Sequence, residues 1–317
     1  MYRYVAKRLV QLPIVVLAVL IVIFLLINMA PGDPADFLIG EVSDPAYKAM
    51  LRQRWGLDQP LFQRMLTYLS NVLRGDLGQS YMFGRPVFDV IMEKVPATLL
   101  LMGASFILSV VFGVILGTWA AKGKKPINAL VTLLTIGYSI PVFWLGQILI
   151  IVFAVYLSWF PASGMMSLKD AMPFPLDTLW HLFLPAVANS LFLLAVTSRL
   201  TRGSVGEALE QDYILTARSK GLSENTVFFK HALRNALLPV VTMTGLRLGA
   251  FLSGAIFVET VFSWPGLGYL MQQATLARDY PLLLGLFAFI SVGVIIVQLI
   301  VDVLYTFIDP RVGYQSG

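Results

Sequence analysis

Six long apolar segments, separated by polar ones, dominate the pattern of this chain. A helix rises about 1.5 Å per residue, so about 20 apolar residues cross the roughly 30 Å hydrocarbon layer of a bilayer. Each segment has about this length, and the pattern therefore predicts an all-α membrane protein with six transmembrane helices. We place them at residues 9–29, 96–121, 129–157, 182–200, 238–262 and 282–307.

The most polar stretch lies between the fourth and fifth predicted spans, within residues 203–237. Its pattern predicts two short helices joined at a glycine. Ser204 and Glu207 have the spacing of a capping box. Gly221 occupies the place of a helix C-terminus, and Ser223 can cap the next helix. An ordered and charged loop of this length in a membrane protein indicates a docking surface.

Residues 31–95 form a second polar region, which is too long for a simple connector. Apolar residues recur in it at three- and four-residue spacing, which predicts an amphipathic helix. Two interpretations stay open: a helix lying flat against the bilayer, or an outer surface that meets a partner or covers a pore mouth. The apolar positions are Phe62, Met65, Leu66, Leu69 and Leu73, and the polar ones are Gln63, Arg64, Tyr68 and Asn71.

The composition agrees with a polytopic membrane protein. Hydrophobic residues make up 57% and charged residues 13% of the chain, and the mean hydropathy is +0.77; soluble domains are about 25% charged. The net charge is +5, but the basic residues cluster at the ends of apolar runs and in loops, which indicates topology signals rather than nucleic-acid binding. Cysteine is absent, which excludes disulfides, thiol nucleophiles and thiolate metal sites.

Basic clusters set the expected orientation. Three of them fall on one side of a six-span arrangement and, with Arg311, hold 13 of the 23 lysines and arginines. Nine lysines and arginines lie on the opposite side, and seven of these nine are in residues 31–95. The positive-inside rule loses force for a segment of that length. Both termini, including residues 1–8, are therefore predicted to be cytoplasmic. The first apolar run is long and lacks an evident cleavage site, so we interpret it as a retained anchor.

No catalytic motif accompanies this pattern. The chain has no phosphate-binding G-x-x-x-x-G-K-[ST] loop, so it carries no signature of an ATPase. Its two histidines, His181 and His231, lie on opposite sides of the predicted membrane, and no G-x-S-x-G elbow or paired mid-span carboxylates occur. We therefore predict that the chain is not an enzyme and has no catalytic or metal-binding residue.

Polar residues within and beside the spans are candidates for a translocation path. Arg247 lies near mid-membrane, where a charge is costly unless it faces a cavity or a partner, so it lines a path or a subunit interface. Glu259 lies near the outer end of the fifth span, where water or headgroups would solvate it. Residues 263–281 are predicted to form a segment at the outer mouth, which serves either as a gate or as an aromatic interface anchor. Its candidate residues are Trp264, Pro265 and Gly266.

Small residues form two stripes that predict close helix packing. One consists of Gly245, Gly249 and Ser253, beside Arg247, and the other of Gly113 and Gly117.

Several motifs, in the same order along the whole chain, resemble those of the permease subunits of binding-protein-dependent ABC importers, in the dipeptide, oligopeptide and nickel branch. Each motif alone is weak, but their combination is specific. They are residues 29–34 (MAPGDP), 56–60 (GLDQP), 75–80 (GDLGQS), 212–221 (DYILTARSKG), 231–239 (HALRNALLP), 258–262 (VETVF), 264–268 (WPGLG) and 309–311 (DPR).

The resemblance implies that residues 203–237 form a cytoplasmic loop that seats in a groove of an ATPase subunit. Stiff capped helices with a sharp glycine bend suit such a coupling role, and Arg218, Lys220 and Lys230 can pair with acidic groups of the ATPase. Leu215 stands where the broader family signature begins with Glu. The matching positions are Asp212, Tyr213, Thr216, Ala217, Arg218, Lys220, Gly221, Lys230, His231 and Arg234.

The resemblance further implies a single permease domain over residues 1–317, of the type I importer fold, in the bacterial cytoplasmic (inner) membrane. The chain would form half of the path for a peptide, nickel, glutathione or similar solute. The implied partners are a second homologous permease, two ATP-binding subunits carrying ATP and Mg, a solute-binding protein and membrane lipid, without nucleic acid. No cofactor would bind this chain itself.

Two other classes stay open. An ion- or proton-coupled secondary transporter acting without an ATPase would show internal repeats and intramembrane carboxylates; no repeat is obvious, and Asp302 lies close to the cytoplasmic end. A scaffold protein that moves nothing is the other alternative.

Overall fold

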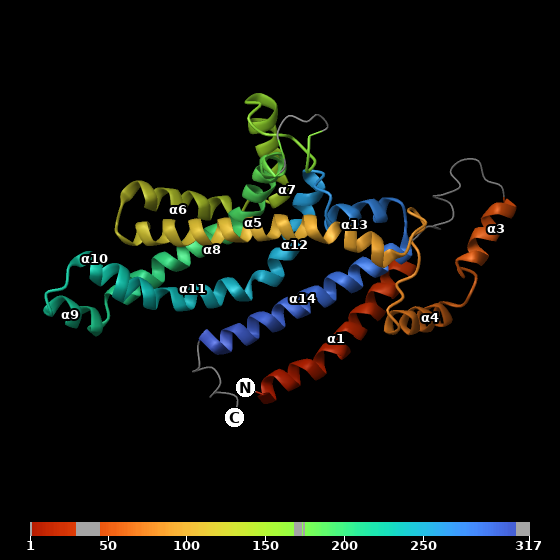
Figure 1. The fold of residues 1–317 in the computed structure, drawn as a ribbon, viewed down its shortest axis with the longest axis horizontal. Helices are drawn as coiled ribbons and strands as arrows, with labels where there is room; N and C mark the ends of the chain where they lie inside the picture. Colours follow the sequence, from red (N-terminus) through yellow and green to blue (C-terminus); the bar gives the residue numbers. More distant parts are fainter. Residues whose placement is uncertain (1, 30–44, 168–172, 174, 309–317) are drawn as a thin grey trace. The chain divides into compact units, whose positions relative to one another are not determined.

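The computed structural model describes residues 2–29, 45–167, 173 and 175–308, and all its regular elements are helices (Figure 1). The described residues contain no strand, only an isolated bridge between Gln79 and Pro86, which confirms the all-α prediction. The helices are α1 (Tyr2–Met29), α3 (Pro45–Arg54), α4 (Leu61–Leu73), α5 (Val87–Ala121), α6 (Lys125–Gly137), α7 (Val142–Leu149), η1 (Ile150–Tyr156), α8 (Leu176–Leu209), α9 (Asp212–Ser219), α10 (Glu224–Thr226), η2 (Val227–Leu233), α11 (Arg234–Leu246), α12 (Leu248–Val261), α13 (Leu267–Leu276) and α14 (Tyr280–Ile308).

The chain divides into two compact units. The first combines Met1–Ala97 with Pro265–Ile296, and the second combines Thr98–Trp264 with Val297–Gly317. The long helices α5 and α14 each contribute residues to both units.

Three helices are long and apolar enough to cross a membrane within the described residues: Val87–Ala121, Leu176–Leu209 and Tyr280–Val301. They contain the second and fourth predicted spans and most of the sixth. The described apolar part of α1, Pro13–Met29, is shorter. Three predicted spans thus stand as single long helices, while the full count of six stays a prediction.

The third predicted span is not one straight helix. Lys125–Gly137 and Val142–Tyr156 meet at a bend of 116°, which corrects the expectation of a continuous helix over residues 129–157. Pro141 explains the break, because it lacks an N–H donor and its ring disfavours helical backbone at Ile140. Beyond α7 the chain winds as the π-helix η1.

The fifth predicted span is also interrupted. α11 ends and α12 begins at Arg247, which has φ −88° and ψ −5°. The expectation of one helix over residues 238–262 was therefore wrong at this point. Gly245 and Gly249 flank the junction, and glycine weakens helices. A Cβ on Gly245 would lie 3.2 Å from Val301 Cγ1, which agrees with close packing at this small-residue stripe.

Asp279 ties together two distant segments of the first unit. Its buried side chain caps α14, accepting from the backbone N–H of Leu282 at 3.1 Å. The same carboxylate accepts from the Ser80 hydroxyl and from the N–H of Met82. Ser80 belongs to the sequence motif at residues 75–80, so its hydrogen bond to Asp279 holds this motif against the start of α14. The adjoining core contains Val87, Ile91, Leu270, Leu282 and Leu286.

α5 and α8 approach closely in the second unit. A Cβ added to Gly113 would lie 2.7 Å from Thr197 Cβ, and one added to Gly117 would lie 2.4 Å from the carbonyl oxygen of Ser198. The Ser109 hydroxyl donates across the same contact to the carbonyl of Ser190 at 2.9 Å. This geometry confirms the packing interpretation of the Gly113 and Gly117 stripe.

α4 confirms the predicted amphipathic helix. Phe62, Leu66 and Leu73 are exposed, whereas Tyr68 stacks on Phe24 of α1 and donates to the carbonyl of Leu284. The polar side of α4 therefore faces the rest of the first unit. Its exposed apolar side is compatible with both interpretations of this helix, the membrane surface and a partner.

Candidate functional site

The polar loop has the local structure that its sequence predicts. Gly221 adopts φ +76°, a left-handed conformation that glycine enters without strain. Ser223 caps the next helix, its side chain accepting from the N–H of Thr226 at 3.4 Å. The capping box was wrong, because α8 continues through Ser204 and Glu207 to Leu209. Each new helical turn is stabilised by the turn before it, so a cap signal inside a propagating helix is not used.

The loop has its own apolar core, which makes it a stiff element. α9 buries Ile214 and Ala217 against Val227, Phe228 and Ala232 of η2, with Val205 and Ala208 of α8 beside them. The small side chain of Ala217 therefore allows α9 to pack closely against η2 of the same chain. In Figure 1, α9 and α10 lie beyond the paired ends of α8 and α11.

Most of the predicted coupling residues lie on the surface of this loop. The exposed ones are Asp212, Tyr213, Thr216, Arg218, Lys220, Gly221, Lys230 and Arg234, while His231 is partly buried and Ala217 is buried. Arg218 is already paired, because its guanidinium donates to Glu224 at 2.9 Å and 3.2 Å. Lys220 and Lys230 form no ion pair with any described residue. The loop therefore presents exposed cations and the exposed side chains of Tyr213 and Leu215.

The structure adds a lysine contact that the sequence analysis missed. Lys122, in the turn after α5, places its Nζ 4.5 Å from the ring centroid of Phe228 and 4.3 Å from that of Phe229. Trp119 completes the cluster, with Lys122 at 5.3 Å and Lys124 at 4.1 Å. Cation–π contacts of this kind contribute about 0.5–2 kcal/mol each. The basic turn beside Trp119 was the available signal, but it had been used only for topology.

Glu259 is buried, contrary to expectation. Its side chain is 0% exposed, and Thr98 Oγ1 donates to it at 2.7 Å. A polar partner in the protein thus takes the role that had been assigned to water or headgroups. Trp264 is also fully buried, which argues against an aromatic interface anchor at this position.

The outer mouth segment has the predicted turn and short helix. Gly266 precedes α13, and Pro265 is partly buried beside it. The Gly164 N–H donates to the carbonyl of Phe262 at 2.9 Å and so fastens the preceding loop of the second unit. Whether Trp264, Pro265 and Gly266 act as a gate stays a prediction.

Arg247 sits at the break between α11 and α12. Its Nε is buried and has no hydrogen-bond partner in the described residues. An unsatisfied guanidinium nitrogen is costly, so this position is compatible with either predicted role, a path or a subunit interface.

Asn189 is a polar candidate that the sequence analysis missed. It is buried in α8, and its Nδ2 has no hydrogen-bond partner in the described residues. A single amide inside an apolar run was the signal that could have identified it.

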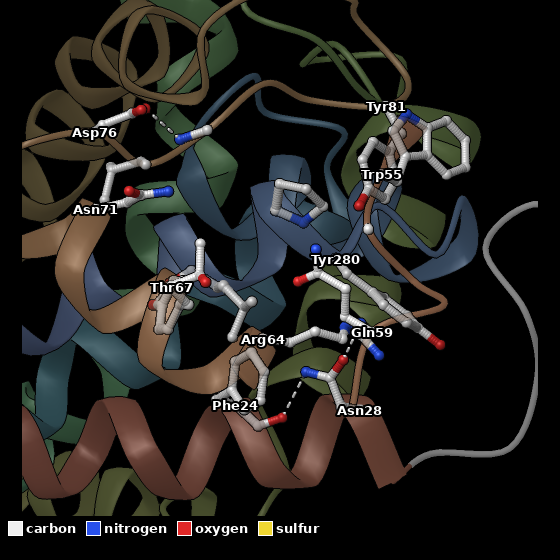
Figure 2. A pocket seen from close by; sticks show the side chains of 16 residues that line it. Phe24, Asn28, Trp55, Gln59, Arg64, Thr67, Asn71, Asp76, Tyr81 and Tyr280 are labelled. Carbon is white, nitrogen blue, oxygen red and sulfur yellow. Dashed lines mark hydrogen bonds between the residues drawn. The ribbon is translucent and has the colours of Figure 1, made fainter. Parts of the chain in front are cut away.

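A cavity of about 360 Å³ lies within the first unit (Figure 2). Its walls come from the end of α1, the segment after α3, α4, the segment between α4 and α5, and the start of α14. The sequence analysis did not anticipate it. The lining residues that carry charge, amide or aromatic groups are Phe24, Asn28, Trp55, Gln59, Arg64, Tyr68, Asn71, Asp76, Tyr81 and Tyr280.

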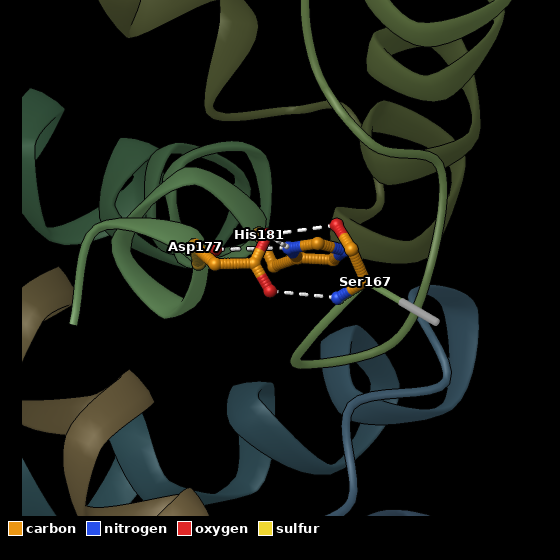
Figure 3. A network of polar contacts seen from close by, with 3 residues as sticks. All are labelled: Ser167, Asp177 and His181. Carbon is orange, nitrogen blue, oxygen red and sulfur yellow. Dashed lines mark hydrogen bonds and ion pairs between the residues drawn. The ribbon is translucent and has the colours of Figure 1, made fainter. Parts of the chain in front are cut away.

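A serine, an aspartate and a histidine meet at the start of α8 (Figure 3), but not as a hydrolytic triad. Ser167 donates to Asp177 twice, through its N–H and its hydroxyl, both at 2.7 Å. His181 Nδ1 lies 2.9 Å from the Asp177 carbonyl. Because the serine contacts the carboxylate rather than the imidazole, no base activates it. The contacts fasten the loop before α8. The described residues also contain no group of three or more metal-ligating side chains.

Comparison with known proteins decides the family. The model described as "Binding-protein-dependent transport system inner membrane component" matches residues 109–314, and the corresponding N-terminal model matches residues 1–102. The chain belongs to this family. It is a permease subunit of a binding-protein-dependent ABC importer, as the motif resemblance had indicated.

Curated relatives match this permease over nearly its full length. The glutathione transport system permease protein GsiC of Escherichia coli O6:H1 is 41% identical, and that of strain K12 is 40% identical; each match covers 99% of this chain and 100% of the relative. The di/tripeptide transport system permease protein DppB of Pseudomonas aeruginosa is 39% identical, again over 99% of this chain and 100% of the relative. These matches place the permease in the peptide and glutathione branch and favour the importer over the secondary-transporter alternative.

Proposed function

We propose that this permease forms half of the membrane path of an ATP-driven importer for a small peptide-like solute. The partners of the proposed complex are a second homologous permease, two ATP-binding subunits that carry ATP and Mg, and a solute-binding protein. The names of the relatives, which refer to glutathione and to di- and tripeptides, support this class of solute. The proposed location is the bacterial inner membrane, with six crossings and both termini in the cytoplasm.

One observation carries the proposal: the loop around α9 has its own core and presents two lysines, Lys220 and Lys230, that form no ion pair with any described residue. A coupling element transmits motion only if it keeps its shape under load. The packed Ile214 and Ala217, the turn at Gly221 and the cap at Ser223 all fix that shape. Lys220 and Lys230 are then available to acidic groups on an ATPase. In the proposed cycle, ATP closes the ATPase pair, the docked loops move, and the path opens toward the loaded binding protein.

Charge reversal at the loop tests the proposal. We expect Lys220→Glu combined with Lys230→Glu to reduce ATP-driven uptake of a dipeptide into proteoliposomes by about tenfold, the effect of losing roughly 1.4 kcal/mol of docking free energy. Arg74→Glu, an exposed position after α4, is the matched control. Copurification of the ATPase with each variant shows whether docking itself is lost. Full uptake by the double variant, or uptake that persists after ATP depletion, would overturn the proposal.

A further inference from the structure

The cavity of the first unit contains a cation that pairs with no acidic side chain of the described residues. Arg64, on α4, is partly buried and lines the cavity together with the amide side chains of Asn28 and Gln59. Its guanidinium donates to Asn28 Oδ1 and forms no ion pair with any described residue. Asn28 in turn donates to the Phe24 carbonyl at 2.8 Å, which fixes the orientation of its amide. Figure 2 shows Arg64 reaching toward Asn28, with Gln59 beside it.

The titratable groups that line the described part of the wall do not offset this charge. Asp76 accepts from the backbone N–H of Gly78 at 2.8 Å and lies on a different part of the wall from Arg64 (Figure 2). Burial raises the pKa of Tyr68 to about 12, and burial also raises the pKa of Tyr81. Both phenols are therefore neutral at physiological pH. A partly desolvated guanidinium in such a setting favours a bound oxyanion, which it can hold through two parallel N–H donors.

Aromatic side chains supply the apolar part of the same cavity. Trp55 and Tyr81 stack with their ring centroids 3.9 Å apart, and Phe24 and Tyr68 stack at 5.5 Å. A volume of about 360 Å³ falls at the small end of ligand-binding pockets. The orientation of α4 supports a binding role, because the helix turns Arg64 and Tyr68 toward this space and leaves Phe62 exposed on its other side.

We propose that this cavity binds the anionic head of a small amphipathic molecule, with its oxyanion at Arg64 and its apolar part against the stacked aromatic pairs. The anion is either the carboxylate of a free solute or the phosphate of a lipid. The inference goes beyond the importer function and needs no ATPase, so it can be tested on the isolated full chain.

Two ligands of matched shape test the free-solute arm. N-acetylphenylalanine carries a carboxylate, whereas N-acetylphenylalanine amide is neutral. We expect the full chain in phosphatidylcholine nanodiscs to bind the acid about tenfold or more tightly than the amide, because hydrogen bonds to ionised groups are the strong ones. Arg64→Gln is expected to remove this preference, while Arg74→Gln, outside the cavity, is expected to keep it. Arg64→Lys retains the charge, and it replaces Arg64→Gln in the binding comparison if the glutamine variant does not fold.

Native mass spectrometry tests the lipid arm. A phospholipid that stays bound to the wild-type chain and to Arg74→Gln, but not to Arg64→Gln, would assign the anion to a lipid headgroup. If the acid and the amide bind wild-type protein equally and no lipid depends on Arg64, the proposal is overturned. If ATP-driven uptake is intact in that case, only the binding proposal fails and the importer function is retained. If ATP coupling fails instead, the binding measurements still decide the binding proposal.

Discussion

Single residues decide how closely the long helices approach. Gly117 faces α8 so tightly that an added Cβ would lie 2.4 Å from the Ser198 carbonyl oxygen, whereas Gly103, on the same helix, has nothing within 4 Å of an added Cβ. The two glycines therefore form a natural pair for separating steric crowding from helix propensity.

We expect Gly117→Ala to lower the free energy of unfolding by about 1–3 kcal/mol, because overpacking forces the backbones apart. Gly103→Ala is the control and should be neutral or stabilising by about 0.5–1 kcal/mol, because alanine favours helix. Thermal unfolding of the purified chain, followed by tryptophan fluorescence, measures both. Equal midpoints for the two variants would contradict the close contact between α5 and α8.

Among the elements, the loop around α9 is held from the side by the turn after α5. Lys122 contacts Phe228 and Phe229 of η2 through its ammonium group. Motion of the loop is thereby linked to α5, one of the three long apolar helices.

Lys122→Gln is predicted to loosen this link. We expect amide hydrogen exchange in η2 to accelerate about fivefold, which corresponds to the loss of roughly 1 kcal/mol of cation–π stabilisation. Lys122→Arg should retain most of the protection, since its charge can still lie over the rings. Lys125→Gln, at an exposed position in the same turn, is the matched control. Unchanged exchange in Lys122→Gln would show that the lysine does not stabilise η2.

Local signals in the sequence predicted the loop well and the broken helices poorly. Gly221 and Ser223 act on their immediate neighbours, so their roles follow from residue type alone. The bend before Pro141 and the break at Arg247 lie inside long apolar runs, and a hydropathy window averages over such breaks.

Tertiary partners account for the remaining differences. Glu259 was expected in water because it lies near a helix end, but Thr98, distant in sequence, encloses and satisfies it. The orientation of α4 has the same origin: the hydrophobic pattern predicts two faces, and the contacts of Tyr68 with Phe24 and Leu284 show which face lies against the first unit. The cavity at Arg64 was missed for this reason, since its wall combines α1, α4, α14 and the segments before and after α4.

For the whole molecule, the central question is which loops lie on which side of the membrane. The chain contains no cysteine, so single cysteines can be introduced without a background signal. Ser163, in the loop between η1 and α8, and Ser219, in the loop around α9, are both exposed. The six-crossing arrangement places the first outside and the second in the cytoplasm.

We expect a membrane-impermeant maleimide to label Ser163→Cys in intact spheroplasts and to label Ser219→Cys only after permeabilisation. Ser109→Cys, buried between α5 and α8, should stay unlabelled in both conditions and controls for unfolded protein. α8 is the one candidate span between residues 163 and 219, so the pair reports whether α8 crosses the bilayer. Labelling of both positions from the same side would mean that α8 does not cross, which would contradict the six-crossing arrangement and the cytoplasmic position of the coupling loop.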